Sequence, residues 1–125
     1  MTASSIPTRA EQVAVVESFL DCIVRKSFDR LPIAPEYTAQ SPLTPKLAGQ
    51  AALDYLRVVA RAVNAIRIEQ HIVEGHHVAT LFEEDTANGT IPVFSRFHIE
   101  EGRIKDVRVF YDPRGIAASP ESGTR

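Results

Sequence analysis

A few polar side chains in this 125-residue sequence could do chemistry, and one of them is acidic and predicted to face inward. Glu84 is the only carboxylate that the strand pattern points toward the interior, which makes it a weak candidate for a general base. Burial would raise its pKa toward a useful range, because an apolar environment disfavours the charged form. The alternative is a solvated position near a hairpin end, since acidic side chains are rarely buried without a partner.

Hydroxyl groups form a second set of candidates. Tyr37, Ser41, Ser95 and Tyr111 could orient the carbonyl or hydroxyl of a ligand. The alternative is ordinary hydrogen bonding in a loop or in the core, because buried polar groups need partners in any case. Whether the protein is an enzyme therefore stays open at this point.

Histidine and cysteine give weaker signals. His76 and His77 fall at a predicted turn, while His71 and His98 fall on strands with their side chains expected to face outward. No His-x-His or His-x-x-x-His spacing joins them to a carboxylate on one element, so no metal or other cofactor is predicted. Cys22 lies among apolar helical neighbours and is expected to be a small buried side chain rather than a nucleophile.

Segment 78–112 should form most of the sheet that positions these groups. It contains three runs of strand-forming residues, separated by Asn88-Gly89 and by a second, glycine-containing turn. A two-residue Asn-Gly turn would pair Ala87 with Thr90, and a three-residue turn suits the second hairpin. Because directly paired residues share a face, this pairing predicts the inner face. Its members are Thr80, Phe82, Val93, Ser95, Phe97, Val107, Val109 and Tyr111, with Glu84 near the rim.

Two amphipathic helices and one further strand are predicted before that segment. The first helix follows Thr8, with Glu11 three residues on as a capping box, and the second begins near Gly49. Four prolines within 32–45 predict a crossing loop with at most one short edge strand. Alternation over 66–74 predicts a half-buried strand. Together these elements predict an α+β domain in which helices cover one face of a bent sheet and enclose a pocket.

Composition limits the classes of function. A chain that is 44% hydrophobic and 24% charged fits a single domain over 1–125, with an ordered core of about 8–113 and flexible ends. The formal net charge of -2 gives no large positive field, so nucleic acid is not an expected partner. No apolar run reaches the roughly 18 residues of a membrane span, and no signal-peptide core is present. We therefore expect no membrane association and a cytoplasmic location, with which the single cysteine agrees.

Three short motifs, taken in order, resemble the nuclear transport factor two-like superfamily and its SnoaL-like branch. They are Gly49-Gln50-Ala51-Ala52-Leu53, Gly102-Arg103-Ile104 and Phe110-Tyr111-Asp112-Pro113. The resemblance covers about 9–113 and implies a cone-shaped fold with a curved antiparallel sheet, covered on its concave face by N-terminal helices. It also implies a ligand pocket and, commonly, a homodimer formed through the outer face of the sheet. Members include ketosteroid isomerases, limonene epoxide hydrolases, polyketide cyclases, scytalone dehydratases and binding-only proteins, so the fold leaves the function open.

The catalytic acids of those relatives have no counterparts here. Phe19, Ser41 and Ser95 stand where the steroid isomerases have a tyrosine and two aspartates, although a one-residue gap would place the third match at Phe94. Val109 stands where the epoxide hydrolases have an aspartate. Neither phenylalanine nor serine at its ordinary pKa can act as the base, so the paired carboxylates of these enzymes are missing.

The sequence therefore favours a protein that binds a small hydrophobic ligand, cyclic or aromatic, in an apolar pocket. The expected ligand-binding residues are Phe19, Tyr37, Ser41, Leu56, Phe82, Ser95, Phe97 and Tyr111. An isomerase, cyclase, dehydratase or hydrolase that uses Glu84 or a tyrosine is the second hypothesis. A dimeric interaction protein with a vestigial pocket is the third.

The outer face of the sheet is expected to carry the homodimer contact, because it combines large apolar and arginine side chains. Its predicted members are Leu81, Phe94, Arg96, Asp106, Arg108 and Phe110, together with Ile104. In the predicted pairing Arg96 lies opposite Asp106, and Arg108 lies opposite Phe94. A closed two-fold pair is the commonest assembly of this kind.

Overall fold

The computed structural model describes residues 7–114, so the flexible ends predicted at 1–7 and 114–125 lie outside it apart from Pro7 and Arg114. The elements follow in the order α1 (Arg9–Arg25), a short 3-10 helix η1 (Phe28–Arg30), β1 (Ile33–Ser41), β2 (Thr44–Ala48), α2 (Gly49–Ala62), β3 (Val63–Glu74), β4 (His77–Thr86), β5 (Gly89–Glu100) and β6 (Arg103–Phe110).

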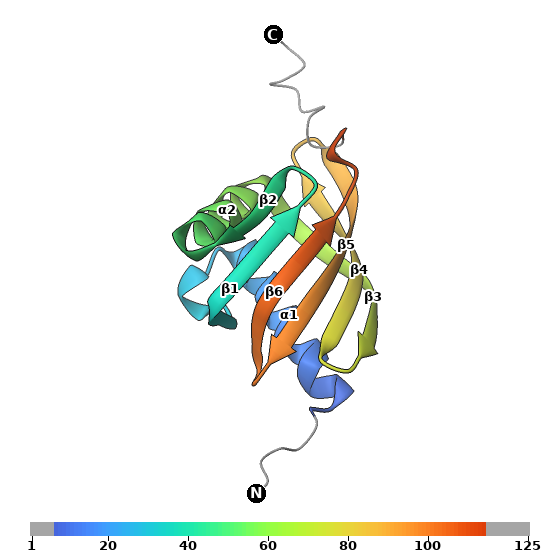
Figure 1. Cartoon of the computed structure of the whole chain (residues 1–125). Coiled ribbons are helices and arrows are strands. Elements are labelled where there is room, and N and C mark those ends of the chain that lie inside the picture. The colour runs from blue at the N-terminus through green and yellow to red at the C-terminus, as the bar shows by residue number, and fades with distance from the viewer. Residues whose placement is uncertain (1–6, 115–125) are drawn as a thin grey trace, which may run out of the picture.

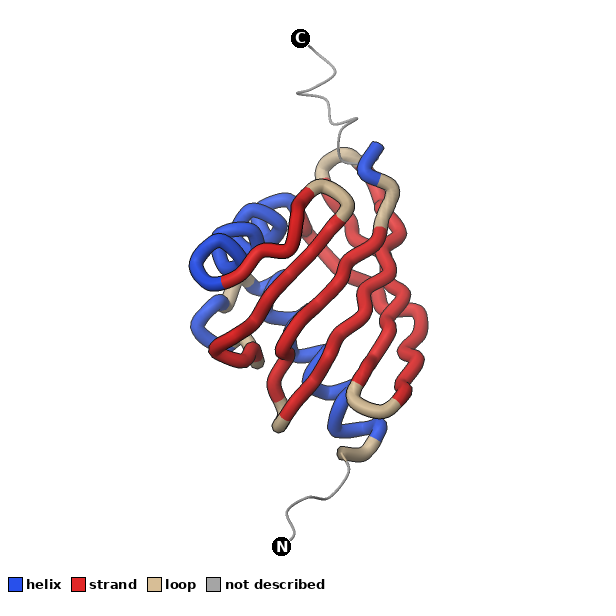
Figure 2. The backbone as a smooth tube through the Cα atoms, viewed as in Figure 1, coloured by secondary structure: helices blue, strands red, loops and turns tan. Residues whose placement is uncertain are grey.

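The six strands form one sheet in the order β2-β1-β6-β5-β4-β3, and both helices lie on the same side of it (Figure 1). All neighbouring strands are antiparallel except β1 and β6, which run parallel. The predicted α+β class is confirmed, with a sheet that is mixed rather than wholly antiparallel. The backbone trace shows the long strands bending together around the helices (Figure 2).

Helix α1 starts where its local sequence predicts. The Thr8 hydroxyl accepts from the Glu11 backbone N–H at 3.1 Å, and the Thr8 N–H donates to the Glu11 carboxylate at 2.8 Å, which confirms the capping box. Lys26 adopts a left-handed conformation that ends the helix. The buried stripe faces the sheet and contains Gln12, Val16, Phe19, Leu20, Cys22 and Ile23.

The proline-rich segment contains two strands, contrary to the predicted crossing loop. Strand β1 pairs with both β2 and β6, so it lies inside the sheet. Pro35 falls where the pairing with β6 is interrupted between Ile33 and Thr38, so its missing N–H donor is tolerated there. Pro42 lies in the turn after β1, and Pro45 lies in β2 at the edge of the sheet. Each proline thus occupies a position that needs no ladder hydrogen bond from it.

The hairpin between β4 and β5 turns one residue earlier than predicted. Thr86 pairs with Gly89, so Ala87 and Asn88 form the turn instead of the Asn-Gly pair. The Thr86 hydroxyl accepts from the Asn88 N–H at 3.1 Å and donates to the Gly89 carbonyl at 2.9 Å, and so closes this turn. Every predicted cross-strand pair is displaced by two residues, which leaves each side chain on the predicted face.

The hairpin between β5 and β6 has a two-residue turn at Glu101 and Gly102, both with positive φ, rather than the predicted three-residue turn. Lys105 is then an extra residue in β6, because the register shifts beside it. This bulge lets both Ile104 and Val107 face inward. Ile104 is fully buried, which corrects its predicted outward position.

A second bulge, at Glu69 in β3, changes which residues of this strand face the helices. Ile72 is 53% exposed, although Ile66, an even number of residues earlier in the strand, lines the interior. His71, predicted to face outward, has a side chain only 8% exposed. Its Nδ1 lies 2.8 Å from Thr80 Oγ1, and its Nε2 lies 3.0 Å from a carboxylate oxygen of Glu17 on α1. His71 therefore links the sheet to the helix.

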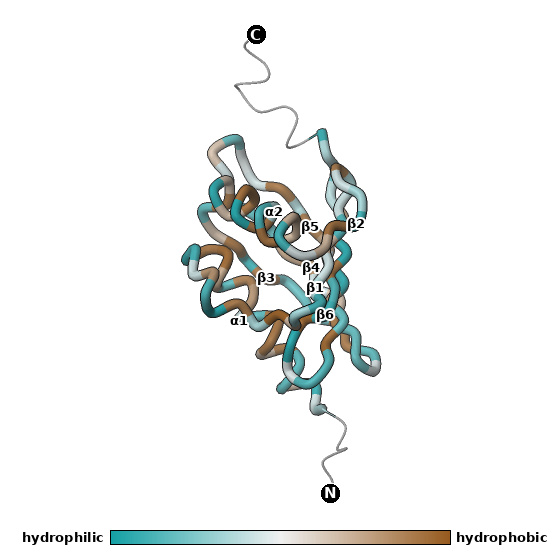
Figure 3. Tube along the Cα trace, turned by 60° about the vertical axis from the view of Figure 1, so that its left-hand side comes forward, coloured by the Kyte–Doolittle hydropathy of each residue, from teal (hydrophilic) through white to brown (hydrophobic). Residues whose placement is uncertain are grey.

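The hydrophobic core lies between the inner face of the sheet and the two helices. Hydrophobic segments recur along α1, α2 and the neighbouring strands (Figure 3). None of the helices in residues 7–114 is long and apolar enough to cross a membrane.

Candidate functional site

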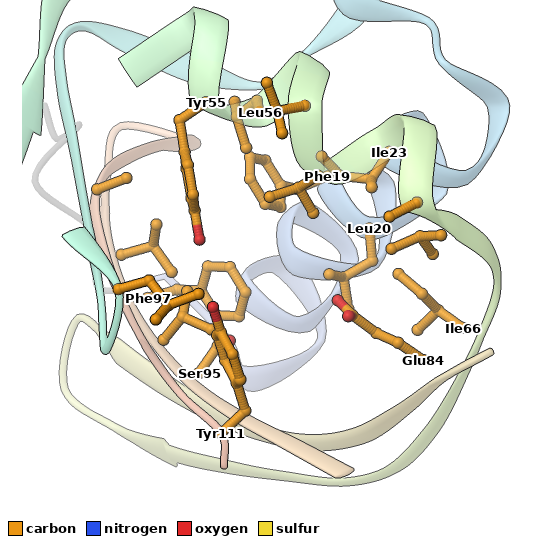
Figure 4. A pocket seen from close by; sticks show the side chains of 18 of the residues that line it. Phe19, Leu20, Ile23, Tyr55, Leu56, Ile66, Glu84, Ser95, Phe97 and Tyr111 are labelled. Atoms are coloured by element: carbon orange, nitrogen blue, oxygen red, sulfur yellow. The ribbon is translucent and has the colours of Figure 1, made fainter. Parts of the chain in front are cut away.

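A pocket of about 200 Å³ lies between the inner face of the sheet and the helices (Figure 4). Both helices and β1, β3, β4, β5 and β6 contribute to its wall, so its shape depends on the whole fold. The side chains that line it are Phe19, Leu20, Ile23, Tyr37, Ala39, Leu43, Tyr55, Leu56, Val58, Val59, Ala62, Val63, Ile66, Glu84, Thr86, Ser95, Phe97, Val107, Val109 and Tyr111.

Six of the eight predicted ligand-binding residues line this pocket, namely Phe19, Tyr37, Leu56, Ser95, Phe97 and Tyr111. Phe82 is not among the lining residues, although it belongs to the same buried core as Phe19 and Phe97. Ser41 is also outside the lining, and its hydroxyl makes local contacts with Thr44 Oγ1 at 3.2 Å and with the Leu43 N–H at 3.2 Å. For Ser41 the geometry is that of ordinary hydrogen bonding near the turn.

Several lining residues were not predicted from the sequence, among them Tyr55, Leu43 and Val58. Tyr55 lies on α2, three residues after Ala52 and four before Val59, so the helical period could have placed it on the inward side. Leu43 and Val58 also line the pocket although they are 55% and 53% exposed. Exposed apolar side chains beside a pocket are typical of its mouth, and no periodic pattern in the sequence marks them.

Glu84 reaches the pocket from β4, where its cross-strand neighbours are Ile66 and Ile91. Its carboxyl group is directed into the pocket (Figure 4). Burial raises the pKa of this carboxyl to about 7, and no charge or hydrogen bond from the described residues offsets the effect. Glu84 is therefore a poorly solvated acid within an apolar wall, whereas the sequence also allowed a solvated position near a hairpin end.

Tyrosine hydroxyls supply most of the other polar groups. Tyr37 is 3% exposed, and its hydroxyl has no hydrogen-bond partner among the described residues. Burial raises the pKa of Tyr37, so it remains a neutral donor. Burial, and then the neighbouring Tyr55, raise the pKa of Tyr111 to about 12. The hydroxyls of Tyr55 and Tyr111 point toward one another across the pocket from Glu84 (Figure 4).

The histidines and the cysteine lie elsewhere. His77 stacks on His98 on the outer face of the sheet, with ring centroids 4.8 Å apart. His76 lies at the turn before β4, and Cys22 is buried on α1. Within residues 7–114 no three His, Cys, Asp or Glu side chains are grouped so that they could hold a metal ion.

The large side chains predicted for the outer face of the sheet lie there, but their cross-strand partners differ from the predicted ones. Phe94 lies opposite Phe110, and Arg96 lies opposite Arg108, because of the shifted register. Phe94 is 38% and Phe110 45% exposed, and the Arg108 guanidinium lies over the Phe110 ring at 5.2 Å. Asp106 pairs with His98 in the ladder but remains 3.7 Å from Arg96.

No family model and no curated protein matches this sequence. Among solved structures, the chain is similar to a SnoaL-like protein from Jannaschia sp. CCS1. The two are 15% identical with a TM-score of 0.77, and the match covers 99% of this chain and 100% of that one.

Two further structures carry different activities in their names. A steroid delta-isomerase from Pseudomonas aeruginosa matches with 21% identity and a TM-score of 0.72, over 94% of this chain and 92% of that one. An LEH-like epoxide hydrolase from M. tuberculosis matches with 19% identity and a TM-score of 0.67, over 90% and 96%. At these identities the likeness concerns the fold, and the activities are those of the other proteins. The chain thus has the nuclear transport factor two-like fold that the sequence motifs indicated.

Proposed function

We propose that this protein binds a small, mainly apolar molecule of one or two rings in the pocket between sheet and helices. The cavity of about 200 Å³ is the observation that carries the proposal. A dry apolar cavity of about 150 Å³ accepts benzene, so this one suits a ligand somewhat larger than a single unsubstituted ring. A four-ring molecule would extend beyond the enclosed volume.

The wall composition supports the same proposal. Small-molecule sites are mostly apolar with a few placed polar groups, and here those groups are hydroxyls and one carboxyl. An inner face filled by its own side chains would instead have favoured a vestigial pocket. The open cavity is an argument against that third hypothesis.

Titration with 2-naphthol, followed by nuclear magnetic resonance of backbone amides, tests the binding proposal. Val109→Phe places a larger ring in the pocket wall and should abolish binding. Leu81→Phe makes a comparable enlargement on the other face of the sheet and should leave binding unchanged. Shift changes that persist in Val109→Phe, or that cluster on the outer face, would contradict the proposal.

An acid/base enzyme is the second candidate, in keeping with the isomerase, cyclase, dehydratase or hydrolase hypothesis. It is favoured by the pKa of about 7 for the Glu84 carboxyl, since a general base is most effective when its pKa lies near the working pH. Glu84 would remove a C–H proton, and a tyrosine hydroxyl would donate to the oxygen on which negative charge develops.

The probe 5-nitrobenzisoxazole tests this candidate, because removal of its C–H proton breaks the N–O bond and releases a coloured phenolate. The rate should rise as the pH passes through about 7. Glu84→Gln should lower it by about 100-fold or more. Glu83→Gln, on the adjacent outward-facing residue, is the matched control and should leave the rate unchanged. An unaltered pH profile in Glu84→Gln would exclude Glu84 as the base.

We also propose that two copies associate through the outer face of the sheet, around Leu81, Phe94, Arg96, Asp106, Arg108 and Phe110. Exposed aromatic rings beside arginine are typical of interface centres. Size-exclusion chromatography with light scattering should therefore give twice the chain mass at low micromolar concentration, and a monomer alone would contradict the proposal.

The cytoplasmic location expected from the sequence stays a prediction.

A further inference from the structure

We propose that the ligand is a protonated aliphatic amine carrying one or two rings, whose ammonium group pairs with the Glu84 carboxylate while its rings lie among the aromatic side chains of the pocket. This inference rests on the proposed binding function and adds the chemical class of the ligand to it. It assigns Glu84 the role of a counter-ion, which differs from the role of a base on a neutral substrate.

The charges of the pocket wall carry the first step. Glu84 is the only carboxylic acid among the described lining side chains, and none of them is a lysine, arginine or histidine. A carboxylate or phosphate ligand would find no cation and would be repelled by Glu84 when this side chain is ionised. A cation would find one unpaired negative charge. Charge complementarity thus favours a ligand with a single positive group.

The surroundings of Glu84 carry the second step. Its neighbours across the sheet are Ile66 and Ile91, and Leu20 and Ile23 line the pocket from α1. Among the described residues no hydrogen bond or neighbouring charge stabilises the ionised carboxyl. Removing one partner of a buried ion pair leaves an uncompensated charge that strongly destabilises the site. When Glu84 is ionised the folded chain bears this cost, so an ammonium group that enters gains a poorly solvated partner.

The aromatic walls carry the third step. Phe19 and Phe97 meet edge to face at 5.7 Å, and Tyr55 and Tyr111 lie across the pocket from Glu84 (Figure 4). Aromatic faces attract ammonium groups and pack against rings, which is why aromatic pockets recognise organic cations. The tyrosine hydroxyls could bind a polar substituent at the far end of the same ligand. The pocket therefore has a side with the carboxyl group of Glu84 and an aromatic side opposite it.

An isosteric pair of two-ring probes, 2-aminoindane and 2-indanol, tests the amine proposal by isothermal titration calorimetry at pH 8. The amine should bind about tenfold or more tightly than the alcohol, because hydrogen bonds to charged groups are the stronger ones. Glu84→Gln should abolish this difference. Glu83→Gln should retain it, since Glu83 faces the opposite side and pairs with Arg67. If Val109→Phe abolishes the heat of binding, the probe binds in the pocket.

Proton release gives a second readout that needs no variant. At pH 5.5, well below the pKa of about 7, the free Glu84 carboxyl is mostly protonated, and pairing with an ammonium group favours its ionised form. Binding of 2-aminoindane should therefore release protons, seen as a difference in heat between two buffers of unlike ionisation enthalpy. Binding of 2-indanol should release none.

The possible outcomes separate the two proposals. Equal affinities for amine and alcohol that Glu84→Gln leaves unchanged would overturn the amine proposal and leave the binding function standing. So would binding of the amine without proton release. If the wild-type protein binds neither probe at millimolar concentration, both proposals fail together.

Discussion

Replacing Glu84 with glutamine should remove a large pH-dependent loss of folding stability. Burial raises the pKa of this carboxyl from its ordinary value of 4.5 to about 7 in the folded protein. Between these values the folded chain holds a proton that the unfolded chain has released, so the free energy of unfolding falls as the pH rises. A factor of ten in an ionisation constant is worth about 1.4 kcal/mol, so the full loss, reached above pH 7, is about 3 kcal/mol.

The sign of the effect distinguishes this carboxyl from one held in an ion pair, whose pKa is lowered and which adds stability as the pH rises. At pH 4.5 and below, Glu84→Gln should change the free energy of unfolding by less than about 1 kcal/mol, because both side chains are then neutral. At pH 8.5 the variant should be more stable than the wild-type protein by about 2 to 3 kcal/mol.

Urea denaturation followed by circular dichroism at pH 4.5, 6, 7 and 8.5 measures this difference for each protein. Glu83→Gln serves as the control, because Glu83 lies on the same strand in an exposed ion pair with Arg67 at 3.1 Å. Such pairs contribute about 0 to 1 kcal/mol, so this variant should follow the wild-type pH dependence. If Glu84→Gln follows it as well, the description of Glu84 as a desolvated acid is wrong.

Three further predictions concern other parts of the fold. Thr8→Ala should lower the free energy of unfolding by about 1 kcal/mol in urea denaturation through loss of the capping box, and an unchanged value would show that the cap is not needed. Tyr37→Phe removes a hydroxyl without a partner in the described structure, so the free energy of unfolding should change by less than about 1 kcal/mol; a loss of about 2 kcal/mol would reveal a hydrogen bond to that hydroxyl. Phe94→Glu should convert the proposed dimer to a monomer in light scattering while binding in the pocket persists, and a dimer that survives would place the interface elsewhere.

The face assignments of the sheet could be predicted from the sequence because they depend only on the two-residue period of a strand. Phe82, Ser95 and Phe97 lie inside as expected, although their partners differ. Register depends on turn geometry, and there a threonine hydroxyl outweighed the preference of Asn-Gly for the central turn positions. A displacement of two residues changes every cross-strand pair but leaves each side chain on the same face of the sheet.

Bulges and the long-range pairing of strands could not be predicted from the sequence pattern. The extra residues at Glu69 and Lys105 reverse the alternation, which is why His71 and Ile104 were placed on the wrong side. The prolines argued against a strand at β1, but proline is excluded only at positions whose backbone N–H donates a hydrogen bond to a neighbouring strand. Which positions those are depends on β6, some 70 residues later in the chain.

The candidate site was predictable where one strand or helix decided it. Glu84 was identified by strand parity alone, and the apolar wall by the same argument. Tyr55 was missed because the apolar pattern predicted for α2 contained aliphatic residues only. The raised pKa of Glu84 depends on apolar side chains from three other elements, and no local pattern contains that information.

Strand β6 is the last element of the fold, and it is inserted between β1 and β5. While the chain emerges from the ribosome, the two flanking strands each present an open edge until Arg103–Phe110 arrives. Such edges invite pairing with other nascent chains, and the long separation of β1 from β6 makes correct closure slow. Biogenesis of this protein should therefore depend on protection of the unfinished sheet during translation, and a chain truncated before Arg103 should aggregate rather than fold.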